Sequence, residues 1–208
     1  MKLLIAILFV CGLGAGAFFF ETEGFTVLTT EGARRADVLR HPRTVPDIAL
    51  HNSGGKTHTL IEELRSDPRV AIITFMYTRC VTVCVSLGTG LQQLQAQIQA
   101  QELQDRVRLL SVSFDPADTP ERLARYEYGM GAAPGVWRAL GMANAAERTL
   151  LLQAFGIIVV PAPLGQYEHN AAYHVVTPDA QLVRIVDVDD IASLLRHAVA
   201  VGNPGEPS

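Results

Sequence analysis

The feature that most constrains this chain is a strand-like run that leads into a cysteine pair and then into a helix. Residues 70–76 are mainly apolar and rich in β-branched side chains, which predicts a buried strand. Cys80 and Cys84 follow, with three residues between them. The apolar positions after the pair then recur as on one face of a helix, and they are Leu87, Leu91, Leu94 and Ile98. This arrangement is typical of sulfur chemistry, in which the dithiol either exchanges with disulfides or holds a soft metal.

Length and composition place the chain among ordinary globular proteins. It has 208 residues, of which 49% are hydrophobic, enough for one domain with a proper core. The net charge is −4 and no basic stripe is present, so we expect no nucleic-acid partner. Three cysteines are too few for a fold held together by disulfides.

The N-terminus carries a membrane signal. Residues 3–20 lack charge and are just long enough to span a bilayer, between Lys2 and Glu21. The positive-inside rule places Lys2 in the cytoplasm and the rest of the chain outside. We expect an uncleaved anchor, and a signal peptide cleaved at the small residues 15–17 is the alternative. Cys11 is expected to be an apolar residue within the anchor, because bulky residues precede it where lipoprotein processing needs small ones.

The rest of the chain alternates between strand and helix patterns. The further elements expected are a hairpin over 45–60, a strand over 107–114, helices over 120–129 and 144–155, a hairpin over 171–186 and a helix over 190–202. Two buried strands joined by a helix form a βαβ unit and therefore a parallel pair.

These elements predict an α/β fold of the thioredoxin-like kind, with an N-terminal hairpin and a helical insertion, preceded by one transmembrane helix. The expected organisation is an anchor over 1–20, a spacer over 21–43, a domain over 44–202 and a tail over 203–208. The cysteine pair then lies at the carboxyl end of a parallel strand, where open α/β sheets bind their ligands.

The position of the cysteines favours a reactive thiolate. Side chains four residues apart at the start of a helix can face the same way, and the helix N-terminus lowers thiol pKa values. Enzymes of the thioredoxin type usually have two residues between their cysteines. Three residues separate Cys80 from Cys84, and this wider spacing relaxes disulfide geometry and suits a metal.

A metal would need a third ligand, and His169 is the candidate. It lies just before the strand expected from Ala171, and the loop entering that strand lies against the cysteine pair in a thioredoxin-like fold. His174 lies within that strand, and we expect it to pack in the core or support the site. The other histidines are expected at the surface and are His41, His51, His58 and His197.

Two thiolates and one imidazole suit copper in either oxidation state, Cu(I) or Cu(II), and also match a catalytic zinc site with an open position. No general-base glutamate motif accompanies the pair, so an exported dithiol near a membrane favours copper handling over zinc hydrolysis.

Three segments of the chain resemble one known family. They are Phe75–Cys84 (FMYTRCVTVC), Ser111–Pro120 (SVSFDPADTP) and His169–Asp179 (HNAAYHVVTPD). Together with residues 45–50 and 137–141 they make the chain similar to the Sco/SenC family of membrane-anchored copper proteins, which assist assembly of cytochrome c oxidase. The resemblance runs over about residues 45–200 and implies a thioredoxin-like fold.

The resemblance implies that copper is held by Cys80, Cys84 and His169. It also matches Asp115 to an acidic residue of the family, and Asp115 follows a central strand at the same edge as Cys80, where its carboxylate can face the site. A turn-forming aspartate is the alternative.

The chain departs from the family at four places. Val81 and Val85 stand where the family usually has proline, Glu168 stands where it has aspartate, and Ala180 replaces a common turn glycine. None of these departures removes a ligand. Proline would stiffen the cysteine loop, so the departures bear on how tightly copper is held.

Three functions follow as hypotheses. The first is a copper chaperone that serves the copper-binding subunit of cytochrome c oxidase or another periplasmic copper acceptor. The second is a membrane-tethered thiol-disulfide reductase, an enzyme in which Cys80 attacks and Cys84 resolves. The third is a redox sensor without a delivery role. His169 favours the first, because dithiol exchange needs no histidine there. In each case the expected location is the bacterial inner membrane, with a single span and the domain facing the periplasm.

Overall fold

The computed structural model describes residues 2–21, 30–80 and 83–202. Its contacts divide the chain into two units, Met1–His41 and Pro42–Ser208.

The first unit contains two helices, α1 (Lys2–Glu21) and α2 (Thr30–Arg40). Within the part of the chain that the structure describes, no helix combines the length and the apolar character needed to cross a membrane. Helix α2 lies in the segment that the sequence predicted to be an unpatterned spacer. Ion pairs within the helix support it, since Arg34 Nη2 and Arg35 Nε lie 2.7 and 2.9 Å from the Glu31 carboxylate, and its residue Val38 is buried.

The second unit is built on a mixed sheet with the strand order β1-β10-β9-β4-β5-β6-β2-β3. Its strands are β1 (Arg43–Thr44), β2 (Ala49–Asn52), β3 (Thr57–Thr59), β4 (Val70–Met76), β5 (Val107–Ser113), β6 (Trp137–Met142), β9 (Tyr173–Val176) and β10 (Gln181–Val186). Strands β4, β5 and β6 are parallel, while β9 runs antiparallel to β4. A separate two-stranded hairpin contains β7 (Val159–Ala162) and β8 (Gln166–His169).

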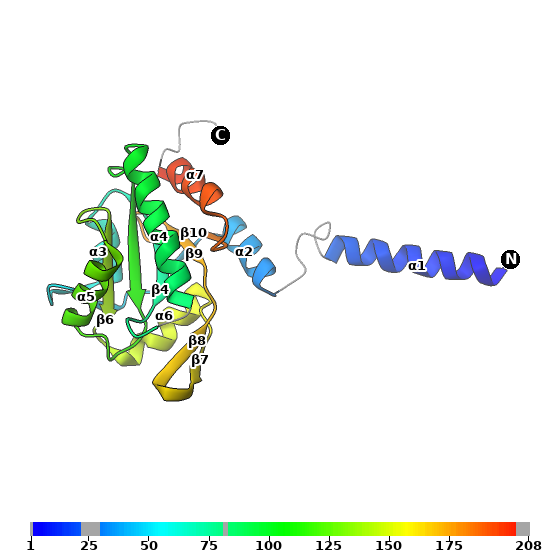
Figure 1. The fold of residues 1–208 in the computed structure, drawn as a ribbon. Helices are drawn as coiled ribbons and strands as arrows, with labels where there is room; N and C mark the ends of the chain where they lie inside the picture. Colours follow the sequence, from blue (N-terminus) through cyan, green and yellow to red (C-terminus); the bar gives the residue numbers. More distant parts are fainter. Residues whose placement is uncertain (1, 22–29, 81–82, 203–208) are drawn as a thin grey trace. The chain divides into compact units, whose positions relative to one another are not determined.

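Helices alternate with these strands along the chain (Figure 1). They are α3 (Leu60–Arg65), α4 (Val83–Ala100), α5 (Pro120–Met130), α6 (Arg148–Phe155) and α7 (Ile191–Gly202), with short 3₁₀ turns η1 (Ala145–Glu147) and η2 (Pro163–Gly165). The α/β architecture and the parallel pair β4–β5 joined by α4 are confirmed.

The core lies where the central strands meet α4 and α7. Every residue of β4 and β5 is buried, as predicted. Strand β4 is mainly apolar and β-branched, whereas β5 also buries the polar residues Arg108, Ser111 and Ser113. The apolar face of α4 supplies Leu91, Leu94 and Ile98 to a cluster that also contains Leu194 of α7 and Ile72 of β4. The cysteine loop therefore joins two firmly packed elements.

Several helix ends have the chemistry expected from the sequence. Proline occupies the first turn of α5 after Thr119, as expected. Gly131 closes that helix in the left-handed conformation, two residues beyond the predicted end at residue 129. Asn144 caps η1 by accepting from the backbone N–H of Ala146. The Glu147 carboxylate accepts a hydrogen bond of 3.1 Å from the side-chain amide of Asn144 and one of 2.7 Å from the backbone N–H of Ala49 in β2. It therefore ties this turn to the sheet.

The sequence missed two features of the sheet. Strand β6 was not predicted, because residues 137–142 (WRALGM) contain no β-branched residue and do not alternate. The β7–β8 hairpin was also missed, and His169 therefore ends a strand rather than lying in a loop. Strand β9 starts at Tyr173, two residues later than the sequence indicated.

Candidate metal centre

Tyr77 fixes the chain just before the cysteine loop. It follows β4 directly and is 1% exposed. Its hydroxyl lies 3.0 Å from Gln166 Oε1 and 3.1 Å from the backbone oxygen of Tyr167, either of which can accept its proton. It also accepts a hydrogen bond of 3.1 Å from the Tyr167 backbone N–H. The end of β4 is therefore joined to β8, three residues before Cys80 and two before His169.

A buried carboxylate holds the next residue of the loop. Asp118 is 1% exposed and accepts hydrogen bonds from the backbone N–H and the hydroxyl of Thr78, at 2.7 and 2.5 Å. The Ser113 hydroxyl at the end of β5 donates to the same carboxylate at 2.6 Å. Three donors satisfy a charge that would otherwise be costly to bury. This arrangement fixes the cysteine loop to the neighbouring parallel strand.

Asp115, the predicted site carboxylate, pairs with the residue that precedes Cys80. Its Oδ2 lies 2.7 Å from Arg79 Nη2, and its Oδ1 accepts from the backbone N–H of Ala117. The Asp115 carboxylate raises the pKa of the Arg79 guanidinium, mainly through this hydrogen bond. Asp115 thus combines the two roles considered from the sequence, since it forms a local turn and also reaches the cysteine loop.

Cys80 lies in the loop rather than in the helix. It is half-buried, and its backbone N–H donates to the carbonyl of Tyr77 at 3.2 Å. Helix α4 starts three residues later, and Cys84 is its second residue. The side chain of Cys84 lies outside the described part of the structure, as do Val81 and the Val85 side chain, the two positions where the chain departs from the family prolines.

His169 ends β8 in a setting that suits a neutral imidazole. Its ring meets the ring of Phe114 edge-on at a centroid distance of 5.1 Å, and that of Tyr77 at 6.3 Å. Burial lowers the pKa of His169 and outweighs the opposite effect of the hydrogen bond to the Asn170 carbonyl. Since a carbonyl only accepts, Nδ1 carries the proton in this 2.9 Å contact, and the ring lone pair is on Nε2. A metal ligand of this kind needs that tautomer.

Arg148 packs on two aromatic rings close to His169. The guanidinium carbon of Arg148, at the start of α6, lies 5.0 Å from the ring centre of Tyr167 and 5.6 Å from that of Phe114. The guanidinium is within cation–π distance of both rings. Through these contacts α6 helps to hold the hairpin that ends in His169.

The structure therefore ties two of the three expected copper ligands to one residue. Cys80 is hydrogen-bonded to the backbone of Tyr77, and His169 packs against its ring. Among the described side chains, no three Cys, His, Asp or Glu residues are grouped closely enough to hold a metal ion. The Cys84 side chain is not among them. The donors that are described, a cysteine sulfur and a neutral imidazole, fit a soft metal such as copper.

The other histidines divide between surface and core. His41 is exposed, as predicted. The expectation was wrong for His58, whose side chain is 13% exposed and whose Nε2 lies 2.8 Å from the buried Glu63 carboxylate. His174 is fully buried between Phe75 and Phe155, so its predicted packing role is confirmed.

Sequence reasoning missed Tyr77 and Asp118. A tyrosine after a strand and an aspartate before a helix are common, and neither carries a signal by itself. Both lie inside the segments that resemble the Sco/SenC family, Phe75–Cys84 and Ser111–Pro120. That position is the only signal in the sequence that could have identified them.

The sequence matches a known protein family and one of its members. The sequence model of the SCO1/SenC family matches residues 42–200. A SCO1 protein homolog from Bacillus subtilis (strain 168) is 27% identical over 196 residues, which cover 90% of this chain and 95% of that protein.

Two solved structures are similar in fold. One is BsSco, described as a member of the Sco family of cytochrome c oxidase assembly proteins with a disulfide switch. It is 26% identical, with a TM-score of 0.62 over 77% of this chain and 96% of BsSco. The other is Bradyrhizobium japonicum ScoI with copper bound, which is 20% identical, with a TM-score of 0.61 over 78% of this chain and 99% of ScoI.

Proposed function

The chain belongs to the SCO1/SenC family, and on that premise we propose that it is a copper chaperone for cytochrome c oxidase assembly. Copper is its cargo, held by Cys80, Cys84 and His169. It passes by ligand exchange to the copper-binding subunit of cytochrome c oxidase or to another periplasmic copper acceptor. A copper-bound structure of the similar protein ScoI supports the choice of metal.

The observation that carries this proposal is the link through Tyr77. Tyr77 contacts both the loop of Cys80 and the hairpin of His169, so the same residue holds both proposed ligands in place. A dithiol reductase has no need of a neutral imidazole held in one tautomer beside its cysteines. A copper site does need it, because the imidazole must offer a lone pair at neutral pH.

The residues around the ligands have separate tasks in this proposal. Asp118 and Tyr77 fix the backbone on which Cys80 lies, and Arg148 and Phe114 hold the hairpin of His169. Ligands that are held in place lose less conformational freedom when the metal binds.

The location remains part of the proposal. We propose that residues 3–20 anchor the chain in the bacterial inner membrane and that the domain faces the periplasm. The charge distribution around this segment supports that orientation. An alkaline phosphatase fusion after Ser208 should then be active, and an inactive fusion with an active cytoplasmic reporter would contradict it.

A thiol-disulfide reductase is the second candidate. The observation in its favour is that Cys80 lies just before the N-terminus of α4 and directly after a cationic residue, Arg79, both of which favour a thiolate. The Cys80 thiolate would attack a partner disulfide, and Cys84 would resolve the mixed disulfide. The partner would leave with two thiols while a Cys80–Cys84 disulfide forms.

Anaerobic copper titration of the reduced chain tests the main proposal. We expect one copper ion per chain, and loss of stable binding in Cys80→Ser and in Cys84→Ser. Cys11→Ser is the matched control and should bind copper like the wild type. If a variant lacking both Cys80 and Cys84 still bound one copper tightly, the site would lie elsewhere.

A further inference from the structure

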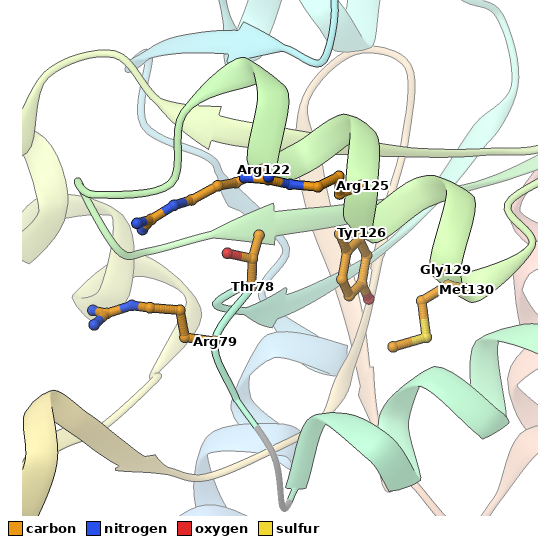
Figure 2. Close-up of a pocket in the computed structure, with 7 residues that line it drawn as sticks. All are labelled: Thr78, Arg79, Arg122, Arg125, Tyr126, Gly129 and Met130. Atoms are coloured by element: carbon orange, nitrogen blue, oxygen red, sulfur yellow. The ribbon is translucent and has the colours of Figure 1, made fainter.

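A cavity of about 430 Å³ opens beside the cysteine loop. It lies between the loop residues Thr78 and Arg79 and one side of α5 (Figure 2). Its lining residues on α5 and at the loop are Thr78, Arg79, Arg122, Arg125, Tyr126, Gly129 and Met130. In Figure 2 the side chains of Arg79 and Arg122 extend in the same direction from the two sides of this cavity.

The charged side chains that line the cavity are all arginines. Arg79 is paired with Asp115 at 2.7 Å, and Arg122 lies 3.9 Å from Asp118. Both carboxylates are buried, and neither belongs to the lining. Arg125 is exposed. Among the described residues, no carboxylate lies within ion-pair distance of the Arg125 guanidinium, and the lining contains no acidic side chain. Arg125 has a charge partner in Glu121, an exposed residue one turn earlier on α5 and outside the lining, whose pKa is lowered mainly by a hydrogen bond from Thr119 and also by Arg125. Three guanidinium groups thus stand around an opening whose described lining offers no exposed countercharge.

The apolar residues of the lining are firmly packed. The ring of Tyr126 meets that of Trp137 edge-on at 6.3 Å. The Met130 sulfur packs so closely on α4 that a Cβ added at Gly88 would lie 2.8 Å from it. An aliphatic stem that ends in a carboxylate matches such a lining, because the stem meets apolar groups and the carboxylate can pair with a guanidinium fork.

We propose that this cavity binds an acidic segment of the protein that receives the copper. This inference rests on the proposed function and adds the chemistry by which the partner is recognised. Arg79 directly precedes Cys80, so an acceptor that approaches the copper ligands must also approach this cavity. Charge complementarity at that point would steer the acceptor and select against basic partners.

A copper-free binding measurement tests the proposal independently of metal transfer. The probes are fluorescent hexaglutamate and hexaglutamine peptides, titrated with the full-length chain in detergent at low ionic strength. We expect hexaglutamate to bind about tenfold more tightly than hexaglutamine, with the difference falling as salt is added. Arg125→Glu should weaken hexaglutamate binding about tenfold. Arg65→Glu, an equal charge change at an exposed position of α3, should change it less than about twofold.

Two results would overturn the inference. One is equal binding of the two peptides, or equal loss in the Arg125→Glu and Arg65→Glu variants, which would show attraction by overall charge alone. The other is displacement of hexaglutamate by inorganic phosphate at similar concentration, which would indicate a site for a free anion. Copper titration of Arg125→Glu is run alongside and should match the wild type. Failure of the wild type to bind copper would contradict the proposed function without deciding the peptide result.

Discussion

The Tyr77 hydroxyl accepts a hydrogen bond of 3.1 Å from the backbone N–H of Tyr167, which joins the strand before the cysteine loop to the hairpin that ends in His169. The same hydroxyl can donate to the Tyr167 carbonyl or to the Gln166 side chain. The proposed copper site depends on this contact, because it brings two distant parts of the sequence together.

Tyr77→Phe tests the contact directly. The change leaves the Tyr167 backbone N–H, and whichever oxygen accepts the hydroxyl proton, without that partner, so we expect a loss of about 1–3 kcal/mol in the free energy of unfolding. Copper affinity should also fall, since the hairpin of His169 loses its attachment. Urea denaturation and copper titration measure the two effects.

Tyr173→Phe is the matched control. Tyr173 is 0% exposed, and its hydroxyl is buried without a hydrogen-bond partner among the described residues. Removing that hydroxyl should leave the free energy of unfolding unchanged or raise it by up to about 1 kcal/mol. If Tyr77→Phe and Tyr173→Phe lowered the free energy of unfolding equally, the hydrogen bonds of the Tyr77 hydroxyl would not be what stabilises the protein.

Replacing Ala180 by glycine should stabilise the fold. It adopts φ = 66° in the turn between β9 and β10, in the left-handed region that is unfavourable for residues with a Cβ. Ala180→Gly relieves this strain but makes the unfolded chain more flexible, so we expect a net gain of about 0.5–1 kcal/mol in the free energy of unfolding. Calorimetry would check the direction, and a lower melting temperature would contradict it. Members of the Sco/SenC family commonly have glycine at this position.

Asp67 should make stability depend on pH in acid. Its hydrogen bonds with Arg69, at 2.6 and 2.9 Å, lower its pKa to about 2. Because the folded-state pKa lies below the unfolded one, the stabilisation is complete above about pH 4 and is lost as pH falls toward 2. Allowing for solvent screening, it amounts to about 1–2 kcal/mol.

Asp67→Asn separates this effect from general acid unfolding. The variant should be less stable than the wild type at pH 7, and the difference should shrink as pH approaches 2. Asp189→Asn, which changes an exposed aspartate, serves as the control and should alter stability little at either pH. A difference between Asp67→Asn and the wild type that stays constant with pH would contradict the assignment.

The sequence predicted the elements whose patterns are strong. The bounds of β4 agree with the predicted residues 70–76 because a buried parallel strand leaves an uninterrupted apolar run. Strand β6 escaped prediction because its residues are held by their neighbours β5 and β2 rather than by their own propensity. A local sequence pattern therefore predicts a central strand only when that strand is also rich in β-branched residues.

The candidate site was predicted by residue type and only partly by position. Asp115 lies where the sequence placed it, just after β5 and at the same edge of the sheet as the cysteine loop. Cys80 follows β4 as expected but lies in the loop before α4, not at the start of the helix. His169 was expected in a loop, and its hairpin was missed because residues 159–169 contain prolines and a glycine that resemble a loop. The bracing by Tyr77 and Asp118 could not be predicted, since hydrogen bonds across 40 and 90 residues have no local signature.

The most direct test of the account is copper binding by His169→Ala, measured beside reduction of a model disulfide by the same variant. If copper is held by Cys80, Cys84 and His169, the variant should bind copper at least about tenfold more weakly and lose most of its Cu(II)–thiolate absorption. It should still reduce the disulfide, because both cysteines remain. Wild-type copper affinity and absorption in His169→Ala would contradict the three-ligand site and favour the reductase.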